Sequence, residues 1–184
     1  GFQGFDQRQR SKGQDLIYEL PMTLEELSKN SQKSLAYHVE GRRQNISVTI
    51  PAGISEGQKL RLKGKGQPSR NGGPPGDLYV KIKELEHPIF RRKGPDLYLG
   101  QQIQFSQAVL GTEVEVPTIS QKRLKLRIPS GTQSGAKFRL KGYGLPVHHG
   151  SGSGNAYVEI QVAVPKKLDK EQKKLIQSLA ETGL

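Results

Sequence analysis

Histidine is the side chain in this sequence with the widest chemistry, and it occurs at His38, His87, His148 and His149. None of these positions has the spacing to carboxylates that a metal site requires, and the Gly/Ser-rich surroundings of His148 and His149 favour solvated rings. The sequence has no cysteine, which excludes disulfides, thiolate zinc sites and cysteine nucleophiles. No G-x-S-x-G element is present. We therefore expect no catalytic residue, no metal site and no cofactor, and a protein that is not an enzyme.

Two short glycine-rich segments are faintly similar to phosphate-binding loops. They are Gly64-Lys65-Gly66 and Gly142-Tyr143-Gly144, and a proline follows each of them, at Pro68 and Pro146. A phosphate-binding glycine loop opens a helix, and these prolines stand where that helix would begin. The two segments are therefore interpreted as tight turns after strands.

Basic side chains alternate along two strand-like segments. The two rows are Lys59, Arg61 and Lys63, and Lys137, Arg139 and Lys141. Such a row can follow a phosphate backbone, and it can equally be a solvated strand face that opposes aggregation. The only aromatic residue within these rows is Phe138, which points to the opposite face. The solvated face is the favoured interpretation, with DNA binding as the alternative.

Composition limits the class of protein without choosing a partner. The chain has 184 residues, of which 33% are hydrophobic and 6% aromatic, and this thin supply of core residues suits two small β-rich units. Its formal net charge of +12 attracts phosphate, acidic polypeptides or anionic membranes. No apolar run approaches the roughly 18 residues of a membrane helix, and no secretory signal is present. We expect a cytoplasmic protein without a membrane partner, associated with the nucleoid if it binds DNA.

An internal duplication organises the chain. Residues 50–68 and 128–146 are identical at 11 of 19 positions, with an offset of 78. The same offset relates residues 76–82 to residues 154–160, and Asp15-Leu16 resembles Asp96-Leu97. Two copies of a unit of about 80 residues follow from this pattern.

Each copy has the period-two alternation of β-strands, as in residues 46–50 and 124–128. Glycine and proline clusters separate the alternating segments. The predicted fold is mainly β, with two tandem small β-sandwich subdomains and short helical turns near residues 24–27 and 108–110. We expect the domains to be a flexible tail over 1–13, a first sandwich over 14–92, and a second sandwich over 93–165.

The last residues, 166–184, predict a helix. Asp169 is a suitable N-cap with Gln172 at the capping-box position, and Gly183 can end the helix. The apolar stripe consists of Leu175, Ile176 and Leu179. A helix of this length is marginal alone in water and needs a surface to pack on. Physical reasoning slightly favours its own second sandwich over another subunit.

The repeated P-x-G-x-x-x-G-x-K-x-R-L-K-G-x-G pattern resembles the C-terminal substrate-binding region of J-domain co-chaperones. Further motifs that carry this resemblance are residues 76–80, 87–92, 94–98 and 108–112. It covers about residues 14–184, and residues 1–5 look like the end of the family's Gly/Phe-rich linker. Members like DnaJ itself insert a zinc module of C-x-x-C-x-G-x-G motifs into the first sandwich. This chain has no cysteine, so it is similar to the zinc-free subclass. Among bacterial members it looks most like the curved-DNA-binding co-chaperones.

The J-domain's His-Pro-Asp signature is missing, since Ile89 follows His87-Pro88. We therefore expect a fragment that stimulates no ATPase by itself. The resemblance implies a co-chaperone function in protein folding and stress response. Its implied partners are unfolded client polypeptides, a DnaK-type chaperone with an acidic C-terminal tail, and a second copy of the chain.

The resemblance also implies the position of the client site, a shallow apolar groove beside an exposed strand of the first sandwich. The implied peptide-binding residues are Ile17, Leu20, Lys33, Leu35, Tyr37, Val39, Val80 and Ile82. We expect Ile17 and Leu20 on the strand next to residues 33–39, with Val80 and Ile82 as the floor. From the residues alone, Leu35 and Tyr37 could equally be ordinary core.

In the family that the sequence resembles, the terminal helix joins two chains. This resemblance outweighs the slight preference for a helix packed on its own second sandwich, and Leu175, Ile176 and Leu179 become the expected dimer contacts. The basic rows are the expected contacts for DNA or for the acidic tail. A purely structural dimerisation scaffold is a further alternative, and it predicts no client binding.

Overall fold

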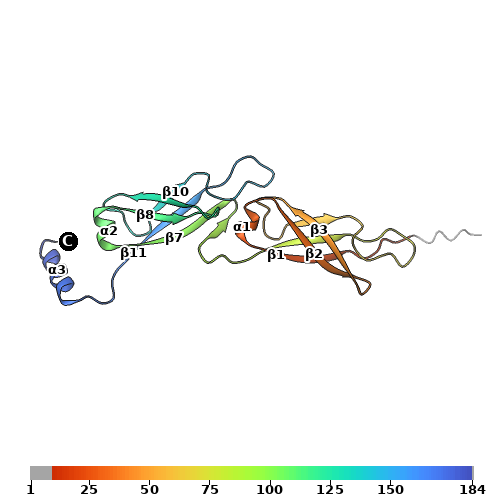
Figure 1. Ribbon diagram of the computed structural model, residues 1–184, viewed down its shortest axis with the longest axis horizontal. Helices are drawn as coiled ribbons and strands as arrows, with labels where there is room; N and C mark the ends of the chain where they lie inside the picture. Colours follow the sequence, from red (N-terminus) through yellow and green to blue (C-terminus); the bar gives the residue numbers. More distant parts are fainter. Residues whose placement is uncertain (1–9, 184) are drawn as a thin grey trace, which may run out of the picture. The chain divides into compact units, whose positions relative to one another are not determined.

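The computed structural model describes residues 10–183 of the chain (Figure 1). The expected Gly/Phe-rich linker remnant at residues 1–5 lies outside this part. The fold is mainly β, as predicted, with several small sheets, two short helices and a C-terminal helix. None of the described helices has the length and apolar character that a membrane span requires.

The first copy contains one helical turn and five strands. In chain order these are β1 (Leu16–Met22), α1 (Leu24–Leu27), β2 (Ser31–Val39), β3 (Arg42–Ile50), β4 (Lys59–Leu62) and β5 (Leu78–Glu84). The strands form a sheet in the order β1-β5-β4 and a separate antiparallel pair of β2 and β3. One buried apolar cluster draws residues from both sheets. This is the sandwich that alternating inward-facing residues predict.

The second copy repeats this pattern with an additional strand. Its elements are β6 (Arg91–Lys93), β7 (Asp96–Gln104), α2 (Phe105–Leu110), β8 (Thr112–Pro117), β9 (Arg123–Ile128), β10 (Lys137–Leu140) and β11 (Ala156–Ala163). The sheet order is β10-β11-β7-β6, with β8 and β9 as a separate pair. The two helical turns predicted near residues 24–27 and 108–110 are therefore present as α1 and α2.

The chain ends in helix α3 (Lys170–Glu181), where a helix was predicted. The Asp169 side chain accepts from the Gln172 N–H at 2.7 Å, and the Gln172 side chain accepts from the Asp169 N–H at 3.0 Å. This is the predicted capping box, which satisfies two N–H groups at the helix start. Gly183 follows the helix with φ of 87°, a left-handed value that glycine adopts without strain.

Backbone contacts divide the chain into two compact units whose limits differ from the predicted domains. The first unit holds the described residues up to Leu99, together with Pro117–Lys122 and Arg139–Tyr157. The second unit holds Gly100–Val116, Arg123–Phe138 and the residues from Val158 onward. The boundaries at residues 13, 92 and 165 remain predictions.

Candidate polypeptide-binding site

Strand β2 is paired on one side only. It runs antiparallel to β3 over its whole length, from Ser31 opposite Ile50 to Val39 opposite Arg42. Within residues 10–183, β2 and β3 form a sheet of two strands, so the other edge of β2 faces no strand. An unpaired edge offers backbone N–H and C=O groups to an incoming extended chain.

Most of the residues predicted to bind a peptide meet beneath β2. One buried cluster includes Leu20, Leu35, Tyr37, Val80 and Ile82, and Val39 packs at its margin. Leu35 and Tyr37 are 3% and 9% exposed, and burial raises the pKa of the Tyr37 hydroxyl. These side chains are thus core residues of the first sandwich, and their contact with a peptide remains a prediction.

Ile17 lies apart from this cluster. Its strand, β1, pairs in parallel with β5 and not with β2, so the predicted pairing of β1 beside β2 is wrong. Consecutive strands are usually neighbours in a sheet, and β1 is an exception because β2, β3 and β4 lie between it and its partner β5 in the chain. Alternation then turns Leu20 inward and Ile17 outward, where Ile17 is 63% exposed.

Lys33 is anchored at the start of β2 by an ion pair. Its ammonium group donates to Glu26 in α1, and the Glu26 carboxylate also accepts from the Thr23 N–H at 3.0 Å. The bond from Lys33 is the main reason why the pKa of Glu26 lies below its ordinary value. Lys33 therefore fastens β2 to the helical turn, with about a third of its side chain exposed.

A buried carboxylate that sequence reasoning missed lies next to β1. The Asp77 side chain is 2% exposed and accepts bonds at 2.8 Å from Lys12 Nζ, Arg61 Nε and the Gly64 N–H. The bond from Lys12 contributes most to a pKa of Asp77 far below the ordinary range. Lys12 also bonds Asp15, and the Gly13 N–H donates to Pro74 O at 2.8 Å. The described end of the expected tail is therefore attached to the first sandwich.

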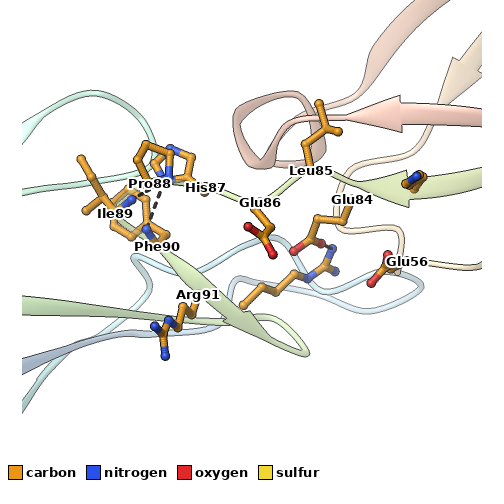
Figure 2. A pocket seen from close by; sticks show the side chains of 11 residues that line it. Glu56, Glu84, Leu85, Glu86, His87, Pro88, Ile89, Phe90 and Arg91 are labelled. Carbon is orange, nitrogen blue, oxygen red and sulfur yellow. Dashed lines mark hydrogen bonds and ion pairs between the residues drawn. The ribbon is translucent and has the colours of Figure 1, made fainter.

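The turn between β5 and β6 is closed by His87 (Figure 2). Its Nδ1 atom accepts from the N–H groups of Ile89 and Phe90, both at 3.0 Å. Its Nε2 atom lies 3.0 Å from Glu25 Oε1. Because Nδ1 accepts, the proton belongs on Nε2, which donates to Glu25. The resemblance marked residues 87–92 as a motif, and the structure gives His87 the role of fixing this turn.

Arg92 is the most heavily bonded side chain near this turn, and its side chain is 7% exposed. Its guanidinium donates to the carbonyls of Gly53 at 2.8 Å and Ile54 at 3.0 Å, and to Glu84 Oε2 at 3.0 Å. Its Nε donates to Gly94 O at 2.7 Å. A single planar group thus satisfies acceptors from three segments of the chain.

The two basic rows differ in how far they are neutralised. In the first row Arg61 is bound to Asp77, with 2.7 Å between Nη2 and Oδ2. In the second row Lys137 lies 3.7 Å from Glu159. The other members are exposed: Lys59, Lys63, Arg139 and Lys141. The rows lie on two different sheets, on β4 and β10 and the turns that follow.

The apolar stripe of α3 is largely uncovered. Leu175 is 65% exposed and Ile176 47%, while Leu179 is half-buried. None of the α3 residues is buried within the described chain. An amphipathic helix with this exposure needs a further surface to be stable in water.

The geometry defines a tandem β-sandwich protein with an open strand edge. Residues 16–165 match the family model described as DnaJ C terminal domain, and the chain belongs to this family. The predicted resemblance to J-domain co-chaperones is thereby confirmed.

Similar proteins carry the name chaperone protein DnaJ. The one from Lysinibacillus sphaericus is 50% identical over 139 residues, which are 76% of this chain and 38% of the relative. The one from Geobacillus thermodenitrificans is 47% identical over 146 residues, 79% of this chain and 38% of the relative. The match thus spans little more than a third of the length of these relatives.

Proposed function

We propose that this chain binds extended segments of unfolded polypeptides at the free edge of β2, as the client-binding part of a co-chaperone. The observation that carries the proposal is a nine-residue strand, paired on one side only, that lies over an apolar cluster. Membership of the DnaJ C-terminal family and the names of the relatives support it.

The proposed chemistry is strand addition. Backbone hydrogen bonds to β2 would hold any extended segment, and alternate side chains of that segment would face Leu35 and Tyr37. The binding site needs no reacting group, and we propose no enzymatic activity. The co-chaperones that the sequence resembles often have phenylalanine at the position of Leu35. The smaller leucine predicts a shallow contact and weak affinity for a single segment.

We further propose that α3 joins two chains. The exposed Leu175 and Ile176 side chains would pack on a second copy, and two linked sites would bind one client more tightly than either site alone. Replacing both residues by glutamate should convert a dimer to a monomer in light scattering. Gln177→Glu, on the same helix, is the control that should stay dimeric.

Delivery of the client to a DnaK-type chaperone, in the cytoplasm, completes the proposal for the whole protein. The relatives extend well beyond the matched region, so a J-domain would belong to the remainder of such a protein. The positive charge of the chain would favour an acidic tail of the partner chaperone at the same edge. Removal of that tail without loss of binding would count against this contact.

The test compares suppression of aggregation of a chemically unfolded protein by the parent chain and by Leu35→Ala. Truncating a buried leucine costs about 2–5 kcal/mol wherever it is placed. The matched control is therefore Leu97→Ala, which removes an equally buried leucine from β7. With both variants folded and dimeric, only Leu35→Ala should lose protection. Equal protection by both variants would place the site elsewhere.

DNA binding by the basic rows is the second candidate, and the exposed Lys59, Lys63, Arg139 and Lys141 side chains favour it. The ion pairs of Arg61 and Lys137 with acidic neighbours reduce the charge available to phosphate. DNA affinity through these rows should fall steeply as salt rises, whereas binding in an apolar groove should change little. The proposal of DNA binding also rests on the resemblance of the chain to the zinc-free co-chaperones that bind curved DNA.

A further inference from the structure

The outer edge of β1 is open, whereas the corresponding edge in the second copy is covered. The first sheet has the order β1-β5-β4, and the second has β10-β11-β7-β6. β7 corresponds to β1, because the Leu97 N–H bonds Asn155 O at 2.9 Å just as the Leu16 N–H bonds Asp77 O at 2.8 Å. In the part of the chain described, nothing takes the place of β6 beside β1.

The hydrogen bonds between β1 and β5 show which backbone groups of β1 have no partner in this sheet. The Leu16 N–H donates to Asp77 O, and Met22 O accepts from the Leu85 N–H. In a parallel pair, alternate residues bond the same neighbour, so the even-numbered residues of β1 face β5. Ile17 and Glu19 therefore direct their N–H and C=O groups to the open edge. Pro21 has no N–H and ends the usable stretch.

Ile17 gives this edge an apolar side chain at the surface. It is 63% exposed, while Tyr98 at the corresponding position of β7 stacks on Tyr157 with 5.0 Å between ring centroids. Edge strands are usually protected by charge or by a covering segment. An uncovered isoleucine beside unpaired backbone groups is the arrangement that suits an added strand.

The chain has a segment of its own that resembles β6 but is held elsewhere. Residues 10–16 read RSKGQDL and residues 91–97 read RRKGPDL, with five of seven positions identical. In the second copy this segment forms β6, with Arg91 opposite Tyr98. In the first copy Lys12 is bonded to Asp15 and Asp77, and residues 10–15 form no strand. The β1 edge is thus left free by its own flanking residues.

We propose that the β1 edge binds an extended client segment, antiparallel to β1, in the way that β6 binds β7. The inference rests on the proposed client binding and adds a second strand-addition edge to it. The pairing of β6 with β7 supplies the template for the orientation, and the exposed Ile17 side chain selects an apolar residue opposite it. The occupant is a short stretch of unfolded polypeptide, since it must supply unpaired backbone groups of its own.

The test is amide hydrogen exchange of the whole chain with and without a blocked seven-residue peptide of alternating leucine and threonine. Binding is measured independently by fluorescence anisotropy. At a peptide concentration about ten times the dissociation constant, exchange of the Ile17 and Glu19 amides should slow about elevenfold. The Tyr18 and Leu20 amides, which already face β5, should not change.

Each outcome separates this inference from the proposed function. If the peptide binds and protects amides of β2 while Ile17 and Glu19 exchange as before, the β1 edge is not a site and the proposed function stands. If the peptide does not bind at all, both fail. As a second measurement, Ile17→Ala should weaken binding at the β1 edge about threefold, so the slowing of Glu19 amide exchange should fall from about elevenfold to about fourfold at the same peptide concentration. Val109→Ala, which trims an exposed residue of α2, should leave affinity unchanged.

Discussion

The two copies of the repeat share a backbone frame. The Gly57 N–H bonds Ile82 O at 2.8 Å, and 78 residues later the Gly135 N–H bonds Ile160 O at 2.7 Å. Each copy also ties its first strand to its last through an aspartate: Asp15 accepts from the Asp77 N–H and Asp96 from the Asn155 N–H, both at 2.7 Å. The sheets are therefore built on the same bonds.

The copies differ in charge and in what covers their edges. The first has a buried carboxylate at Asp77, where the second has the neutral amide of Asn155, which accepts from the Gly142 N–H at 3.1 Å. Lys12 consequently bonds Asp77, whereas its counterpart Lys93 lies over the Tyr98 ring at 5.2 Å. The same frame therefore leaves the edge of β1 open in the first copy, whereas β6 covers the corresponding edge of β7 in the second copy.

The largest expected effect comes from Arg92, whose counterpart in the first copy is Ser11. Arg92→Ala would leave the carbonyls of Gly53 and Ile54 and the carboxylate of Glu84 without their shared donor, which should cost about 3 kcal/mol or more. Ser11→Ala should change stability by less than about 0.5 kcal/mol. Denaturant unfolding measures both. Equal effects of the two substitutions would refute the role given to Arg92.

An intermediate effect on stability is expected from exchanging the aspartate and the asparagine at the corresponding positions 77 and 155. The pKa of Asp77 is depressed in the folded chain, so its contribution is fully present above the unfolded value of about 3.9 and is lost as pH falls through the folded value. Asp77→Asn should therefore lower the thermal midpoint near about pH 7, with a deficit that shrinks below about pH 4. Asn155→Asp places a carboxylate at the position that corresponds to Asp77, in a copy where Arg139 corresponds to Arg61, and should shift the midpoint in the opposite direction. A deficit independent of pH would contradict the ion-pair explanation.

The smallest effect should come from the aromatic pair. Tyr98→Ile gives the second copy the residue that stands at position 17 and removes a stacked pair, which should cost about 1 kcal/mol. Ile17→Tyr places a tyrosine opposite Tyr79 and should be stabilising by about 0.5 kcal/mol. Thermal unfolding of both variants tests the difference, and opposite signs are the expected result.

Periodicity and duplication were sufficient to predict a mainly β fold, the strands around residues 46–50 and 124–128, the two helical turns and the capped C-terminal helix. These features depend on local patterns, such as the alternation of Leu60 and Leu62 or the spacing of Asp169 and Gln172. The pairing of β1 with β5 was missed because register between distant segments leaves no local signal. Ile17 was grouped with Leu20 for the same reason, although alternation separates their faces.

The buried contacts of Asp77 and Arg92 could have been found only in part. The R-x-K-G-x-D-L repeat marks Lys12 and Asp15 as equivalents of Lys93 and Asp96, which is a usable signal for an ordered segment before β1. Nothing in the sequence shows that Arg92 reaches carbonyls about 38 residues away, since that contact depends on how the turns pack.

Binding of clients by the first copy can be tested by titrating the chain with an unfolded polypeptide and following the amide resonance of each residue. We expect the largest changes along Ser31–Val39 and little change along Thr112–Pro117, the corresponding strand of the second copy. The changes should persist at high salt. Dominant changes in the second copy would refute client binding by the first copy, as would changes that are confined to the basic strands Lys59–Leu62 and Lys137–Leu140 and vanish with salt.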